Sequence, residues 1–144
     1  MTNEKGQLLS DVVHIARHYQ RSIRVDADLG RLDALAGYIC HSTATAILEN
    51  MARQLTETNQ RSFTWTGPFG GGKSSLAVAL ASALLPDKNL RTHARNALKL
   101  GAIPSFDKAF PARKGWLVVP VVGKRVSVVV EDRVELLLAA NKGE

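Results

Sequence analysis

The chain has 144 residues, the length of a single domain that can bury a hydrophobic core. Hydrophobic residues make up 45% and charged residues 22%, which excludes a disordered, collagen-like or coiled-coil chain. The net charge is +6, and a single cysteine, Cys40, excludes a disulfide framework and a cysteine-based metal site. The sequence shows no apolar run of membrane-spanning length and no signal peptide, so we expect a cytoplasmic protein without a membrane segment.

The first part of the chain is predicted to form two helices around an extended stretch. Apolar residues recur at helical spacing over residues 8–21, and again over residues 43–56. Ser42 or Thr43 is the expected N-cap of the second helix. Residues 22–29 are polar and are predicted to be extended, so residues 1–41 form an N-terminal helix and extended segment.

The central part is expected to hold one strand and two helices. Residues 62–66 alternate aromatic side chains with threonine, which is typical of a short strand. Residues 74–85 are apolar almost all round, and this predicts a helix covered on more than one side and stopped by Pro86. Residues 90–100 predict a basic helix that Gly101 closes.

The C-terminal part contains one clear strand pattern and one ambiguous segment. Residues 116–122 form an apolar run typical of a buried parallel strand, in which Pro120 indicates a strand end or an edge. Residues 126–140 begin as a strand pattern, but their valines and leucines also fall on one helical face. The helix is the favoured interpretation of this last segment.

The sharpest signal is a glycine-rich loop between the predicted strand and the apolar helix. It matches the phosphate-binding pattern G-x-x-x-x-G-K-[ST]. Its glycines would let successive main-chain amides turn toward a phosphate, at a helix N-terminus that favours an anion. The candidate cofactor-binding residues are Gly67, Pro68, Phe69, Gly70, Gly71, Gly72, Lys73, Ser74 and Ser75.

Three residues at the end of this loop, Lys73, Ser74 and Ser75, have distinct predicted roles. Lys73 supplies an ammonium group to the β- and γ-phosphates and is the candidate catalytic residue. Ser74 places a hydroxyl on Mg²⁺, and Ser75 gives its backbone amide to the α-phosphate. The cofactors expected from this pattern are therefore ATP and Mg²⁺.

The segment TWTGPFGGGKSSLAVALA resembles the Walker A segment of P-loop NTPases, and the helix–strand–loop order is similar to that of AAA+ and STAND ATPases. The resemblance covers residues 38–86. It implies an α/β fold over residues 42–144, a partial P-loop NTPase core with a parallel sheet flanked by helices and an ATPase-like activity. The chain also looks like the N-terminal part of large bacterial ATP-binding proteins, some from phage-defence loci. The resemblance further implies that residues 37–43 help to hold adenine, with Tyr38 either contacting the base or packing as an ordinary aromatic.

Hydrolysis needs an additional acidic element that binds Mg²⁺ and orients water. The candidates are Glu131 and Asp132, which could serve if residues 126–130 form a strand but would face solvent on a helix. Residues 67–144 are too few for a complete AAA+ module, so we expect a chain truncated before completion of the core. Such a chain would hydrolyse ATP weakly or not at all and would tend to form a homo-oligomer or larger assembly. ATP is preferred to GTP because no N-K-x-D motif occurs.

The positive charge is concentrated after the loop, where residues 87–125 carry nine basic and two acidic groups. The basic segment 88–125 is either a solvated face or a nucleic-acid surface. Two alternative functions follow, a nucleic-acid-binding module with a regulatory nucleotide site and a P-loop phosphotransferase. His14 and His18 are expected to be ordinary surface residues rather than metal ligands, and Trp116 a core anchor rather than a base-stacking residue.

Overall fold

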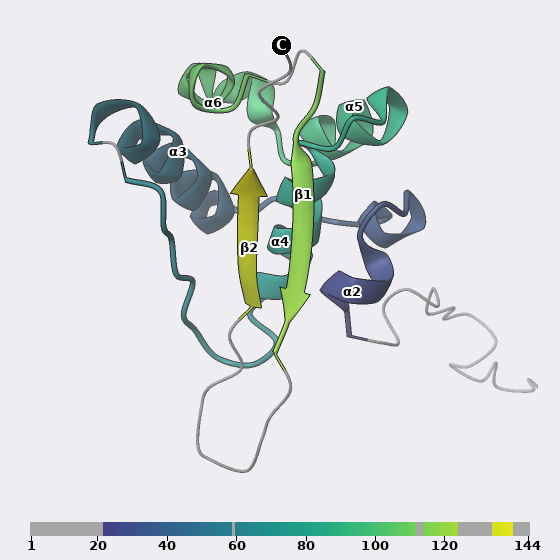
Figure 1. Cartoon of the computed structure of the whole chain (residues 1–144). Coiled ribbons are helices and arrows are strands. Elements are labelled where there is room, and N and C mark those ends of the chain that lie inside the picture. The colour runs from purple at the N-terminus through teal and green to yellow at the C-terminus, as the bar shows by residue number, and fades with distance from the viewer. Residues whose placement is uncertain (1–21, 59, 112–113, 124–133, 140–144) are drawn as a thin grey trace, which may run out of the picture.

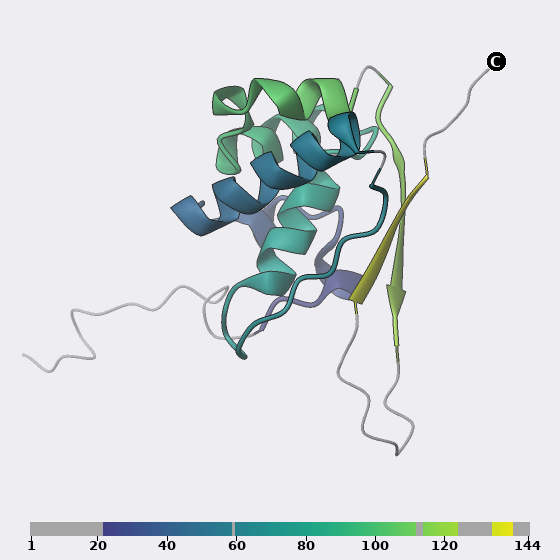
Figure 2. The same ribbon diagram turned by 90° about the vertical axis from the view of Figure 1, so that its left-hand side faces the viewer.

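The structure is a computed structural model that describes residues 22–58, 60–111, 114–123 and 134–139, and this part of the chain is mostly helical (Figure 1). A two-stranded hairpin forms one side of the molecule and the helices form the other (Figure 2). The elements, in chain order, are α2 (Val25–Asp28), the 3₁₀ helix η2 (Asp33–Leu35), α3 (Ser42–Glu57), α4 (Lys73–Ser82), α5 (Lys88–Ala97), the 3₁₀ helix η3 (Leu100–Ala102), α6 (Pro104–Ala109), β1 (Leu117–Val122) and β2 (Val134–Ala139).

The predicted parallel sheet flanked by helices is wrong. Within the described residues the sheet has two strands, β1 and β2, and they pair antiparallel with Leu117 opposite Ala139 and Val122 opposite Val134. The connection between them, residues 123–133, is shorter than the dozen or more residues that a parallel crossover requires. The structure is a small helical domain with a hairpin, not a parallel P-loop core.

Helix α4 forms the centre of the hydrophobic core. All of its residues from Leu76 to Ser82 are buried, and the burial continues through Leu84. A helix that is apolar all round is expected to be covered on several sides, and α4 packs against α5, α2 and η2. The prediction for this segment is confirmed, although the helix ends at Ser82.

Helix α3 packs mainly against α6 and completes the core on another side. Its buried residues are Leu48 and Met51, which the helical spacing predicted, and Ala52, which it did not. Its N-cap is His41 rather than Ser42 or Thr43, and no side chain caps it. The same core also includes Val25 and Leu35 from the segment before α3.

Two elements predicted as extended differ in the structure. Residues 62–66 are extended but pair with no strand in the described chain; Phe63 and Trp65 instead pack their side chains on the core. Residues 22–29 are not extended throughout, because α2 forms within them. The Asp28 carboxylate stabilises this short helix by accepting a hydrogen bond of 2.7 Å from the Arg24 amide.

The C-terminal predictions are also corrected. Residues 117–122 form a strand, but its side chains at Leu117, Val119 and Val121 are exposed rather than buried between two layers. Pro120 lies in a strand that pairs on one side only within the described sheet, as an edge position requires. Residues 134–139 are strand β2, so the favoured helix is wrong there, while residues 126–133 lie outside the described residues.

Helix α5 begins and ends differently from the prediction. The Asp87 side chain caps it by accepting a hydrogen bond of 2.8 Å from the Leu90 amide. The left-handed residue after the helix is Lys99, with φ of 55°, and Gly101 lies inside η3. The predicted closure by Gly101 is therefore wrong, because a lysine adopts the conformation that glycine usually provides.

Candidate functional site

The glycine-rich loop leads directly into the N-terminus of α4. Residues 67–72 are exposed, and the Gly71 amide closes a turn by donating to the Pro68 carbonyl at 3.3 Å. Gly70 and Gly72 have φ of 75° and 76°, a left-handed conformation that side chains disfavour. The pattern therefore placed glycine where the backbone requires it.

The first turn of α4 leaves its amides available to an anion. Gly72 is the N-cap and no side chain caps the helix. The first helical hydrogen bond runs from the Leu76 amide to the Gly72 carbonyl at 2.9 Å, so the amides of residues 73–75 precede the helical ladder. Unpaired amides and the positive end of the helix dipole both favour a bound phosphate.

The Lys73 side chain folds back across the loop. Its Nζ donates to the carbonyl oxygens of Gly67 at 2.8 Å and Pro68 at 2.7 Å. These two bonds hold a positive charge at the mouth of the loop, beside the amides of the first helical turn. In the structure the predicted ammonium group therefore binds carbonyl oxygens at the start of the loop.

Ser74 and Ser75 lie in the first turn of α4 and are partly buried. Neither hydroxyl has a hydrogen-bond partner among the residues that the structure describes. Phe69 points into solvent at the tip of the loop and is 96% exposed. The loop thus presents hydroxyls and amides at its base and an aromatic ring outside it.

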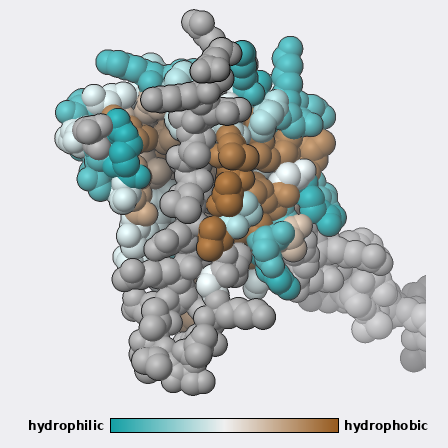
Figure 3. Space-filling model, in the orientation of Figure 1, coloured by the Kyte–Doolittle hydropathy of each residue, from teal (hydrophilic) through white to brown (hydrophobic). Residues whose placement is uncertain are grey.

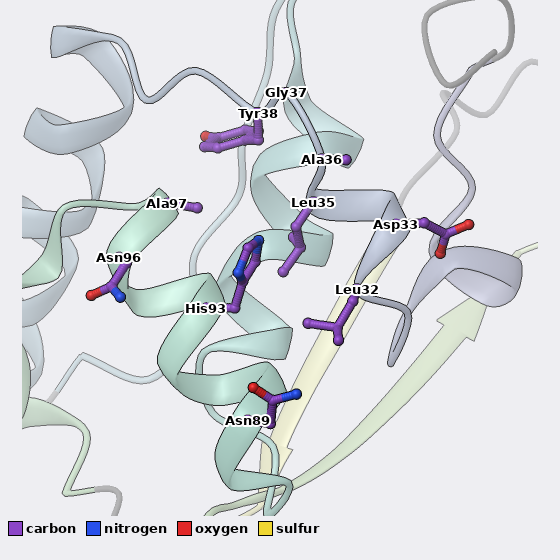
Figure 4. A pocket seen from close by; sticks show the side chains of 10 residues that line it. All are labelled: Leu32, Asp33, Leu35, Ala36, Gly37, Tyr38, Asn89, His93, Asn96 and Ala97. Carbon is purple, nitrogen blue, oxygen red and sulfur yellow. The ribbon is translucent and has the colours of Figure 1, made fainter. Parts of the chain in front are cut away.

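A separate pocket lies between residues 32–38 and one flank of α5 (Figure 4). It has a volume of about 750 Å³. In Figure 4 the side chains of His93 and Leu35 point toward one another in its middle. Tyr38 belongs to its wall and packs against the core, and burial raises the pKa of its phenol to about 12. The lining residues are Leu32, Asp33, Leu35, Ala36, Gly37, Tyr38, Asn89, His93, Asn96 and Ala97.

The polar wall of this pocket was not predicted from the sequence. Asn89, His93 and Asn96 recur at i, i+4 and i+7, so they share one flank of α5. This spacing was the signal that could have revealed the pocket. For Tyr38, the structure leaves both predicted roles open, because the ring lines the pocket and also packs against the core.

Several other candidate residues have structural roles or lie outside the described chain. Cys40 is buried, and its thiol contacts the Leu98 carbonyl oxygen at 3.5 Å. Trp116 donates from its indole nitrogen to the Pro111 carbonyl at 3.2 Å and packs edge-on against Phe110. Cys40 and Trp116 therefore have structural roles. Glu131, Asp132, His14 and His18 lie outside the described residues.

Three general findings complete the description. Among the described residues, no group of three or more His, Cys, Asp or Glu side chains could hold a metal ion. None of the helices in that part of the chain is both long enough and apolar enough to cross a bilayer. Comparisons of the chain with protein-family models, curated proteins and solved structures gave no match.

Proposed function

We propose that the chain binds Mg-ATP through its glycine-rich loop, residues Gly67–Ser75. The observation that carries the proposal is the position of Lys73. Its ammonium group lies across a glycine-rich loop, 2.8 Å from the Gly67 oxygen and 2.7 Å from the Pro68 oxygen, at the start of a helix without a side-chain cap.

The phosphates would be held by atoms that the chain provides in one short segment. The amides of residues 73–75 point out of the helix N-terminus, and Gly70 and Gly72 allow the preceding backbone to curve around an anion. A phosphate entering the loop offers Lys73 a charged partner in place of two carbonyl oxygens. The present bonds already have a charged donor, and a phosphate would add a charged acceptor, which strengthens the contact.

The donor set also fits the cation. The Ser74 hydroxyl lies in the first helical turn and has no partner among the described residues, so it can coordinate Mg²⁺ together with phosphate oxygens. Bound Mg²⁺ would neutralise charge on the β- and γ-phosphates. Hydrolysis would also require the predicted acidic element, Glu131 or Asp132, which lies outside the described residues.

Nucleotide binding can be measured by isothermal titration calorimetry with the full chain, Mg²⁺ and ATP. Lys73→Ala should weaken ATP binding roughly tenfold or more, because a charge-assisted contact contributes about 1.5–3 kcal/mol. Lys99→Ala removes an exposed lysine from another part of the chain and is the matched control. Equal ATP affinity in the Lys73→Ala and Lys99→Ala variants would refute the assignment.

A second pair of variants tests the backbone of the loop. Gly72→Ala places a side chain at φ of 76°, with no atom within 4 Å, so its effect is conformational. Gly101→Ala also enters open space but has no positive φ. We expect ATP affinity to fall in Gly72→Ala alone, and circular dichroism will show whether both variants keep the helical fold. Adenosine, which lacks phosphates, should bind far more weakly than ATP; similar affinities would contradict phosphate binding.

A further inference from the structure

The net positive charge of the described chain comes from its second half. Residues 22–58 and 60–86 carry five basic and five acidic groups, so their formal charges cancel. Residues 87–111, 114–123 and 134–139 carry six basic groups against Asp87, Asp107 and Glu135. The excess therefore arises on α5, α6 and the residues that pack beside them.

The two halves also differ in whether their basic side chains form ion pairs. In the first half Arg24, Arg31 and Arg53 each pair with an aspartate or glutamate two to four residues away. In the second half, the pair between Arg95 and Asp107 is the one ion pair recorded for the described residues. Four exposed lysines there have no carboxylate partner in the described chain, namely Lys88, Lys99, Lys108 and Lys114.

Helix α5 separates charged and uncharged side chains onto opposite flanks. Leu90 and Ala94 are buried and lie on the core-facing side of the helix, between the two flanks. Lys88, Arg91 and Arg95 recur at i, i+3 and i+7 on one flank, opposite the uncharged flank that lines the pocket. Positive charge is thus confined to one side of the helix.

Two contacts bring the remaining lysines to this charged flank. At the start of α5, Gly115 packs against the Pro86 backbone, and Arg91 donates to the Leu85 and Pro86 carbonyls at 2.8 and 3.0 Å. Lys114, the residue before Gly115, therefore lies near the N-terminal end of α5. At the other end, Lys99 follows the last residue of α5 by two positions, and Arg95 pairs with Asp107 of α6, the residue before Lys108.

We call this surface the basic face, and it consists of Lys88, Arg91, Arg95, Lys99, Lys108 and Lys114. Arg91 and Arg95 are partly buried and hold the elements together, so the exposed lysines are the groups free to meet a partner. In Figure 3 hydrophilic side chains project from the end of the molecule where α5 and α6 lie.

We propose that the basic face binds the phosphate backbone of a nucleic acid. Its exposed cations are all lysines, which interact with phosphates as point charges and are depleted at protein–protein interfaces. Strong binding of an amphipathic surface to an anionic membrane uses apolar side chains beside the cations. None of the exposed large hydrophobic residues of the described chain lies on α5 or α6.

The basic face is distinct from the nucleotide site. Helix α4 has ten residues, so the loop at its start and the turn that leads to α5 are separated by about 15 Å of helix. The lysines at the two ends of α5 are likewise separated by about 15 Å, which corresponds to four or five base-pair steps of 3.4 Å. We therefore expect Lys73→Ala to leave nucleic-acid binding unchanged.

The test measures binding of the full chain to a fluorescein-labelled DNA duplex and to a single-stranded RNA, by anisotropy over a series of salt concentrations. Four lysine contacts to duplex DNA predict a slope of log K against log salt near −3.6. The Lys88→Gln/Lys114→Gln variant should bind at least tenfold more weakly at low salt, with the slope reduced in magnitude by about 1.8. The two nucleic acids show whether duplex or single strand is preferred.

The matched control is Arg31→Gln/Arg53→Gln, which removes the same charge from two exposed, locally paired arginines. Its nucleic-acid affinity should stay within about twofold of the wild type. Equal weakening by both double variants, or no binding of either nucleic acid at low salt, would overturn the proposal. Tighter binding to phosphatidylserine vesicles or polyglutamate than to nucleic acid would also overturn it. Unchanged binding in Lys73→Ala is expected, so failure of the ATP assignment is a separate result.

Discussion

The contact between Gly115 and the turn after α4 makes a strong prediction about stability. Gly115 has φ of 82°, and a Cβ there would lie 2.6 Å from the Pro86 nitrogen, 2.9 Å from the Leu85 carbonyl carbon and closer still to the Pro86 Cα. All three are backbone atoms, so no side-chain rotation relieves the overlap. The left-handed conformation costs an alanine about 1–2 kcal/mol, and forced separation of packed segments costs about 1–3 kcal/mol. Gly115→Ala should therefore lower the free energy of unfolding by about 2–5 kcal/mol.

Two other glycines separate the contributions. Gly30 has φ of 86°, and a Cβ there would meet no atom within 4 Å, so Gly30→Ala should cost only the conformational strain of about 1–2 kcal/mol. Gly101 has open space and no positive φ, so Gly101→Ala should change stability by less than about 1 kcal/mol. Urea unfolding followed by circular dichroism measures all three. If Gly115→Ala costs no more than Gly30→Ala, the close approach to Pro86 does not exist.

Three further predictions concern the core, a helix cap and a buried phenol. Phe106 is fully buried, so Phe106→Ala should lower the free energy of unfolding by about 3–5 kcal/mol. Phe69 is exposed, so Phe69→Ala should change the free energy of unfolding by less than about 0.5 kcal/mol. Comparable losses of the two variants in urea unfolding would contradict this. Asp87→Ala removes the acceptor of the Leu90 amide and should cost about 1 kcal/mol in the same assay, and no loss would mean that this cap is not formed in solution. Burial raises the pKa of Tyr38 from its usual 10.0 to about 12, so the stability contributed by the neutral phenol is present below pH 10 and is lost as the pH rises from about 10 to 12. Urea unfolding of the wild type and Tyr38→Phe over this range should show a steeper decline in the wild type, and parallel curves would refute the shift.

The features that the sequence predicted correctly depend on neighbouring residues. A run that is apolar almost all round predicted that α4 would be buried on several sides, and Leu76–Leu84 are buried, Ser82 included. Helical spacing likewise identified the core face of α3. The glycine-rich loop is local in the same sense, because glycine stands at the left-handed positions 70 and 72, while phosphate binding by this loop stays a prediction.

The features that the sequence missed depend on partners distant in the chain. The β-prone run at 62–66 has the right alternation but no partner strand within the described chain, and a strand requires a ladder of hydrogen bonds. Residues 134–139 form a strand because β1 supplies that ladder, which a local helical pattern does not reveal. Helix α6 was missed although Pro104 occupies its first turn, a position that proline favours.

The antiparallel sheet affects the two parts of the proposed chemistry, phosphate binding and hydrolysis, in different ways. Phosphate binding relies on nine consecutive residues, Gly67–Ser75, whose amides, hydroxyls and ammonium group come together whatever the neighbouring strands do. Hydrolysis relies on a carboxylate delivered by a separate strand, and in the parallel core that we expected, this strand would lie beside the loop. Here β1 and β2 pair with each other as an antiparallel hairpin. The proposed nucleotide site therefore does not rest on the sheet topology, whereas hydrolysis rests on Glu131 or Asp132, which lie outside the described residues, so binding assays test the proposal more directly than turnover.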